Sequence, residues 1–111
     1  MAADSRWCTA DEAVARVASG QSVFLSSACG EPQALVEALI RTARRLRDVR
    51  ILTGLQGSKA PYVRPDLALH LRLHTFMASA QVAEAIEKGE ADYAPVQLSR
   101  IPDLMRSRRL P

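Results

Sequence analysis

The sequence predicts an α/β fold, in which a mostly parallel sheet of about four strands is flanked by helices. Short β-rich runs alternate along the chain with segments whose apolar residues recur at helical spacing. Such alternation is typical of parallel strands joined by helical crossovers. The chain has 111 residues and shows no repeat or low-complexity linker, so we expect residues 1–111 to form a single domain.

The strands are expected where β-branched and other apolar residues cluster between turn signals. The last of them contains Pro95, which confines it to a sheet edge or a strand start. The expected strands are residues 22–27, 49–55, 71–78 and 92–99.

The first helix should begin after Thr9, an N-cap residue followed by two acidic residues, and should end at Gly20. Pro32 is expected at the first position of the second helix, where its missing N–H costs nothing. The arginine run at 41–47 lies at the far end of that helix, where the dipole favours cations. We therefore interpret this run as structural rather than as a binding patch.

Two further helices are expected after Ser79 and Ser99, with Gly89 ending the first of them. The stretch 56–70 contains prolines and a glycine and is expected to be a loop, with a short helical turn near 65–69.

Composition narrows the function classes. The net charge is +3 and thirteen of the fifteen cations are arginine, but these are spread along the chain and aromatic residues are only 5%. Because stacking aromatics are missing, we expect no nucleic-acid partner. The spacing of the two cysteines matches neither a zinc site nor a disulfide framework. No apolar run reaches the roughly 18 residues that span a bilayer. The N-terminus does not have the pattern of a signal peptide. We therefore expect a cytoplasmic protein without a membrane partner.

Small and polar residues follow each expected strand. In open parallel sheets, ligands bind beyond the carboxyl ends of the strands. Residues 26–30 are all small and precede a helix N-terminus, which favours anions. The sequence therefore predicts a ligand-binding rim formed by residues 26–31, 54–60, 77–79 and 97–99.

Individual residues on or near this rim allow more than one interpretation. Cys29 could be a nucleophile near a helix N-terminus, but a small buried residue is the favoured interpretation. Glu31 looks exposed and either contacts substrate or favours the first turn of its helix. His70 and His74 have a spacing that suits a metal on a helix, but they lie in an alternating strand pattern with no third ligand, so no metal site is expected.

Three segments in order resemble one family. They are ACGEPQALVEAL at 28–39, AEAIEKGEADY at 83–93 and ADYAPVQLSRIPDLMRSRRLP at 91–111. Together they are similar to the N-terminal domain of acetyl-CoA hydrolases and CoA-transferases, including acetate and 4-hydroxybutyrate CoA-transferases. The resemblance runs from about residue 10 to the end of the chain and covers nearly all of the predicted domain.

The resemblance implies transfer of CoA between an acyl-CoA and a small carboxylic acid, through a glutamyl thioester. Coenzyme A would be a substrate, and no cofactor would be bound permanently. The family's catalytic glutamate lies in a later segment, so no catalytic residue is assigned here, and a homodimer or a complementing catalytic domain is implied. The alternative is a non-catalytic binding or interaction module. The residues that would line the substrate or CoA pocket are Ser27, Ala28, Cys29, Gly30, Glu31 and Pro32.

Overall fold

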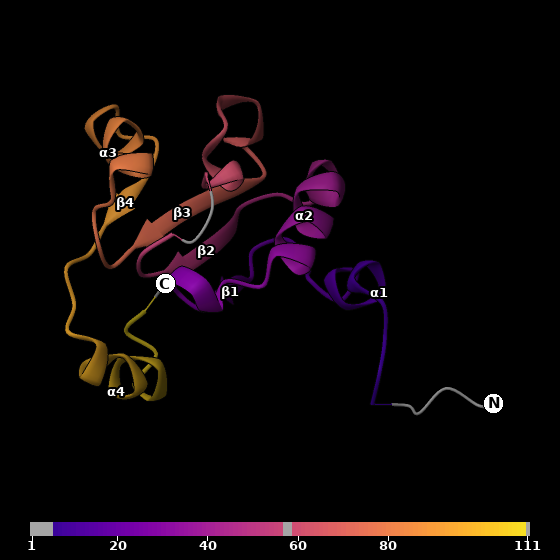
Figure 1. The fold of residues 1–111 in the computed structure, drawn as a ribbon, viewed down its shortest axis with the longest axis horizontal. Coiled ribbons are helices and arrows are strands. Elements are labelled where there is room, and N and C mark those ends of the chain that lie inside the picture. The colour runs from indigo at the N-terminus through magenta and orange to yellow at the C-terminus, as the bar shows by residue number, and fades with distance from the viewer. Residues whose placement is uncertain (1–5, 57–58, 111) are drawn as a thin grey trace.

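The computed structural model describes residues 6–56 and 59–110 and contains a parallel sheet (Figure 1). Every strand pairs with its sequence neighbour in the order β1-β2-β3-β4, and all three pairings are parallel. The predicted fold class is confirmed. The strands are β1 (Ser22–Phe24), β2 (Val49–Thr53), β3 (Leu71–Thr75) and β4 (Asp92–Tyr93).

Helices lie on both sides of the sheet, but unequally. The first three α-helices lie on one side and the fourth lies alone on the other (Figure 1). The α-helices are α1 (Ala10–Val14), α2 (Gln33–Thr42), α3 (Ala80–Glu87) and α4 (Ile101–Arg106). Short 3₁₀ helices are η1 (Ala28–Gly30), η2 (Ala43–Arg45), η3 (Pro61–Val63), η4 (Pro65–Leu67) and η5 (Leu98–Arg100).

The main core fills the space between the sheet and the first three α-helices. Ile51 and Leu73 point into it from the central strands and are almost completely buried, as is Val82 of α3. The core is mainly aliphatic, and the buried Tyr62 also belongs to it. Burial of a side chain of this size contributes roughly 1.5–3 kcal/mol, so this face supplies most of the hydrophobic stabilisation.

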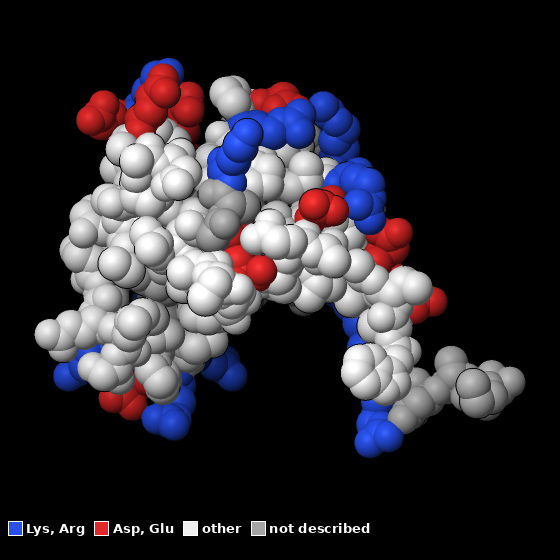
Figure 2. Space-filling model, in the orientation of Figure 1, with Lys and Arg blue, Asp and Glu red and all other residues white. Residues whose placement is uncertain are grey.

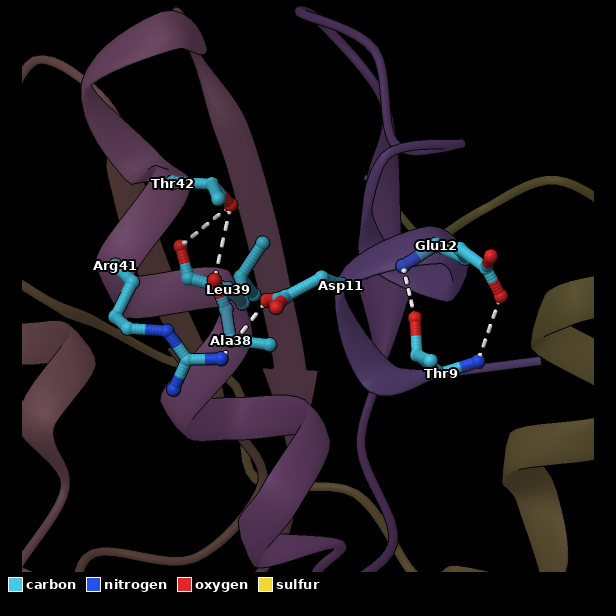
Figure 3. A network of polar contacts seen from close by, with 7 residues as sticks. All are labelled: Thr9, Asp11, Glu12, Ala38, Leu39, Arg41 and Thr42. Atoms are coloured by element: carbon cyan, nitrogen blue, oxygen red, sulfur yellow. Dashed lines mark hydrogen bonds and ion pairs between the residues drawn. The ribbon is translucent and has the colours of Figure 1, made fainter.

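The start of α1 is fixed by a capping box (Figure 3). The Thr9 hydroxyl accepts a hydrogen bond from the Glu12 N–H at 3.1 Å, and the Glu12 carboxylate accepts one from the Thr9 N–H at 2.8 Å. This confirms the N-cap predicted at Thr9. Asp11 of the same turn forms an ion pair with Arg41 of α2 at 2.8 Å, so the two helices are also tied at their surface.

Several boundaries differ from those expected. The helix that begins after Thr9 ends at Val14, and Gly20 lies in the following loop with a φ of +81°, where its N–H donates to the Arg47 carbonyl. Pro32 is the N-cap of α2 rather than its first residue. The chain leaves the sheet after Tyr93, before Pro95, because proline cannot donate a ladder hydrogen bond.

The second face of the sheet carries a smaller apolar cluster. Leu52 and Phe76 are buried there beneath Ile101 of α4. Phe24 of β1 stacks on Phe76 with ring centroids 6.4 Å apart, and its side chain stays 43% exposed. Thus α4 covers only part of this face.

Charged residues at the β3–β4 side of the second face form a compact group. The Arg72 guanidinium donates two hydrogen bonds to Asp92, at 2.6 and 2.7 Å, and His74 Nε2 lies 3.1 Å from an Asp92 oxygen. Hydrogen bonding to Arg72 lowers the pKa of Asp92. Burial lowers the pKa of His74 below its ordinary 6.5; Asp92 opposes this shift, and the nearby Arg72 and Arg50 add to it.

These shifts predict acid sensitivity. A histidine whose pKa is lowered by folding binds a proton more readily in the unfolded chain, so stability falls as pH drops below 6.5. Asp92 acts in the same direction at lower pH, because its paired, ionised form is lost. We expect the free energy of unfolding to fall less steeply between about pH 7 and 5 in His74→Gln than in the unmodified protein. Urea unfolding at several pH values gives the free energy of unfolding of both proteins. The same dependence on pH in His74→Gln and in the unmodified protein would contradict this prediction.

Candidate functional site

The turn after β1 and the loop after β2 are joined by hydrogen bonds at the carboxyl end of the sheet. The Ala28 N–H donates to the Leu55 carbonyl at 2.7 Å, and the Gly54 N–H donates to Ser27 Oγ at 3.2 Å. The structure therefore brings together two of the segments predicted to form the rim, residues 26–31 and the described part of 54–60.

A buried polar network extends this connection to β3. Gln56 Nε2 donates to the Gly54 carbonyl at 2.8 Å and to Thr75 Oγ1 at 3.1 Å. The Ser79 hydroxyl donates to Gln56 Oε1 at 2.5 Å. Because Gln56, Thr75 and Ser79 are all buried, each hydrogen bond satisfies a group that water does not reach. The ends of three strands are thus held in one fixed arrangement.

Gly54 is a point of close approach within this arrangement. A Cβ atom added at Gly54 would lie 2.6 Å from Ser27 Oγ and 3.5 Å from Ser27 Cβ. Only glycine lets the β2 loop approach the turn after β1 this closely.

The small residues of the turn have different roles from those expected. Gly30 does not have a left-handed backbone; the residue that does is Ala28, with a φ of +52°. A Cβ atom at Gly30 would meet only Ser26 Cβ, at the ordinary distance of 3.6 Å. Cys29 is exposed rather than buried, so the interpretation of it as a small buried residue is wrong. Gly30 is also exposed, whereas Ser27, Ala28 and Pro32 are half-buried.

Glu31 was expected to be the exposed carboxylate of the rim, and this is wrong. Its side chain is only 6% exposed. The buried Tyr62 of η3 lies next to it, and burial together with the Glu31 charge raises the pKa of the Tyr62 hydroxyl. Glu31 is thus directed into the protein beside Tyr62.

The start of α2 presents polar backbone groups at the rim. Pro32 has no side-chain group that could cap the helix, and no side chain in the described part of the protein caps it. Uncapped N–H groups and the helix dipole favour an anion at this end.

Other predicted features do not join the rim. Residues 97–99 do not continue a strand; Leu98–Arg100 form η5, which leads directly into α4 on the second face. His70 is buried, and its Nδ1 lies 2.7 Å from the Leu46 carbonyl, so its role is structural. Within residues 6–56 and 59–110, no three acidic, histidine or cysteine side chains gather as metal ligands would. Nor does any helix within those residues have the length and apolar character needed to cross a bilayer.

The matched domain identifies this arrangement. The acetyl-CoA hydrolase/transferase N-terminal domain matches residues 4–108. The chain belongs to the acetyl-CoA hydrolase/transferase family. This confirms the resemblance inferred from the three sequence segments.

Individual relatives support this assignment. The chain is 28% identical over 103 residues to the 4-hydroxybutyrate coenzyme A transferase of Clostridium kluyveri, covering 93% of this chain and 24% of that enzyme. It is 33% identical over 100 residues to the succinyl-CoA:cyclohexane-1-carboxylate CoA transferase of Geobacter metallireducens, covering 89% and 22%. The crystal structure of RipA from Yersinia pestis is similar with a TM-score of 0.73 and 25% identity, covering 87% of this chain and 25% of that one. This member of the acetyl-CoA hydrolase/transferase family therefore spans about a quarter of the length of these relatives.

Proposed function

We propose that this chain binds the acyl-CoA substrate of a CoA-transferase or acetyl-CoA hydrolase at the rim formed by residues 27–32 and the loop after β2. In this proposal, CoA moves between an acyl-CoA and a small carboxylic acid. The nucleophilic glutamate implied by the family is supplied from outside residues 1–111. The chain alone binds but does not catalyse.

The observation that carries this proposal is an exposed turn after β1 that hydrogen bonds hold in one position. Cys29 and Gly30 are exposed at the end of β1, beside the uncapped start of α2. Beneath them, the hydrogen bonds from Ala28 and Gly54 hold the turn in place. Fixed backbone N–H groups at a helix start suit the oxygens of a thioester or a phosphate.

Calorimetric titration with acetyl-CoA tests this directly. The expected result is saturable binding of acetyl-CoA and of coenzyme A, and no turnover when acetate or another small carboxylate is added. A ligand present at 100 times its Kd would stabilise the folded protein by about 2.7 kcal/mol, which a thermal shift assay detects. No binding of either compound at millimolar concentration would contradict the proposed site.

Gly30→Val separates ligand contact from folding. Gly30 has open surroundings apart from Ser26 and a backbone that valine can adopt, so stability should change by less than about 1 kcal/mol. If the ligand approaches the Gly30 backbone, the two added methyl groups and Cβ should weaken acetyl-CoA binding by about tenfold or more.

Ala83→Val on the exposed side of α3 is the matched control, because it adds methyl groups at an exposed position outside the turn at residues 27–32. Acetyl-CoA affinity should be unchanged in this control. Equal affinity in Gly30→Val and in the unmodified protein would show that the ligand does not contact the turn.

A second candidate is a module that acts through protein contacts without catalysis. The observation that favours it is the partial covering of the second sheet face, where Phe24 remains exposed. Binding of a protein partner combined with no response to acetyl-CoA would favour this candidate. The cytoplasmic location expected from the sequence stays a prediction under either proposal.

A further inference from the structure

The second face of the sheet has an uncovered part, which we call the open face and define by Ser22, Phe24 and Arg50. Side chains alternate between the two faces of a strand, and Val23 and Ile51 point into the main core. Their neighbours in β1 and β2 therefore point the opposite way. Ser22 and Arg50 are paired across the two strands. Figure 2 shows a hollow on this side of the molecule, between α4 and the segment before α1.

Parallel sheets are normally covered on both faces, so an uncovered part calls for a covering element. All connections between the four strands run through the face that carries α1, α2 and α3. Within the described residues, α4 and the segments on either side of it reach the second face, where Ile101, Ala94, Val96 and Leu110 pack with Leu52 and Phe76. The uncovered part comprises β1 and the first residues of β2, because Leu52 of β2 is already buried beneath α4.

The border of the open face is apolar. A recess of about 310 Å³ lies between it and the end of α4. Phe24 on one side and Met105 on the other remain 43% and 48% exposed. Large apolar side chains that face one another across a recess mark a contact surface rather than ordinary surface. The recess is lined by Ser22, Phe24, Leu52, Met105, Arg108 and Leu110.

The charge of the open face is positive. Arg50 is half-buried, and its guanidinium makes no ion pair or hydrogen bond within the described part of the chain. Its neighbour across the sheet is Arg72, which is neutralised by Asp92. Figure 2 also shows basic side chains beside the hollow, at the lower end of the part of the molecule that contains α4. The exposed arginines of that segment are Arg100, Arg106, Arg108 and Arg109.

We propose that the open face is a docking surface for an amphipathic helix of a protein partner, with an apolar stripe and flanking acidic residues. The apolar stripe packs on Phe24 and Met105, and an acidic side chain pairs with Arg50. Because Arg50 is half-buried and forms no ion pair with the described residues, a carboxylate brought to it adds both affinity and orientation.

A second copy of this chain fits the open face poorly. A two-fold contact through this face would bring Arg50 and the α4 arginines toward their own copies, and like charges brought together oppose association. A helix with acidic residues beside its apolar stripe removes this repulsion.

The test uses the 111-residue protein and two synthetic helical peptides of about 18 residues, with the same leucine–alanine stripe. One peptide carries glutamates beside the stripe and the other carries lysines. Binding is measured by fluorescence anisotropy without coenzyme A, so the result does not depend on the proposed CoA site. Variants are Arg50→Glu and Phe24→Ser, with Arg44→Glu as a control on an exposed arginine of η2. Circular dichroism checks that each variant is folded.

The glutamate peptide should bind at least about tenfold more tightly than the lysine peptide. Arg50→Glu should abolish this preference, Phe24→Ser should weaken both peptides, and Arg44→Glu should leave the preference intact. Equal affinity of the two peptides, binding of neither, or an unchanged preference in Arg50→Glu would overturn the proposal. So would a dimer, detected by analytical ultracentrifugation, that Phe24→Ser dissociates, because a second copy would then occupy the face.

Discussion

Replacing Gly54 with alanine is expected to destabilise the protein by about 2 kcal/mol and to lower its unfolding midpoint by roughly 10 °C. The physical cause is the added Cβ atom, which would lie 2.6 Å from Ser27 Oγ. To relieve this contact, either the Ser27 hydroxyl rotates away and loses its hydrogen bond with the Gly54 N–H, or the two segments separate and the hydrogen bond between Ala28 and Leu55 lengthens as well. Thermal unfolding followed by circular dichroism measures the effect.

A double-mutant cycle identifies the contact responsible. In a Ser27→Ala background, the hydroxyl is gone and the nearest remaining Ser27 atom would be the Cβ, at 3.5 Å. Gly54→Ala should therefore cost much less in that background than in the unmodified protein. An equal cost in both backgrounds would show that the contact with the hydroxyl is not the cause. Gly30→Ala is the matched glycine control, because its Cβ would meet only Ser26 Cβ at 3.6 Å.

Gln56→Leu is expected to cost about 2–4 kcal/mol. Leucine is similar in size but leaves the Gly54 carbonyl and the Ser79 hydroxyl without the partner that Gln56 provides. Both groups lie where the protein is buried, so water does not replace the lost hydrogen bonds without a rearrangement. Urea unfolding gives the change in free energy.

The matched control is Gln81→Leu, an exposed position of α3, where the change should stay within about 0.5 kcal/mol. Comparable costs at Gln56 and Gln81 would mean that the buried network contributes little to stability. Because Gln56 also holds the loop beside the proposed CoA site, Gln56→Leu should weaken acetyl-CoA binding more than Gln81→Leu does.

The parts of the fold that follow local rules could be predicted from the sequence. The N-cap at Thr9 depends on residues three positions apart, and β2 and β3 are continuous apolar or alternating runs. The strand boundaries were less accurate where tertiary contacts decide them. β1 ends at Phe24 because the chain turns towards the β2 loop, a direction that the run SVFLSS does not encode locally.

The candidate site was predicted by position but not by its contacts. Glu31 follows a turn and precedes a helix, a pattern typical of an exposed first-turn carboxylate. Its burial depends on Tyr62, which lies 31 positions later in a loop and carries no local signal for this contact. Gln56 and Ser79 lie within the predicted rim segments 54–60 and 77–79, but their hydrogen bonds to each other and to Thr75 could not be predicted for the same reason. Only the concentration of small polar residues after each strand indicated that these ends meet.

The strand order also has a consequence for how the chain acquires its structure during synthesis. Each strand of the described sheet pairs first with the strand made just before it, so no strand must wait for a partner that the ribosome has not yet produced. Contacts between neighbouring segments close short loops and form quickly. The sheet can therefore grow in the direction of translation, from β1 towards β4, and α4 is added last, onto a face whose strands are already in place.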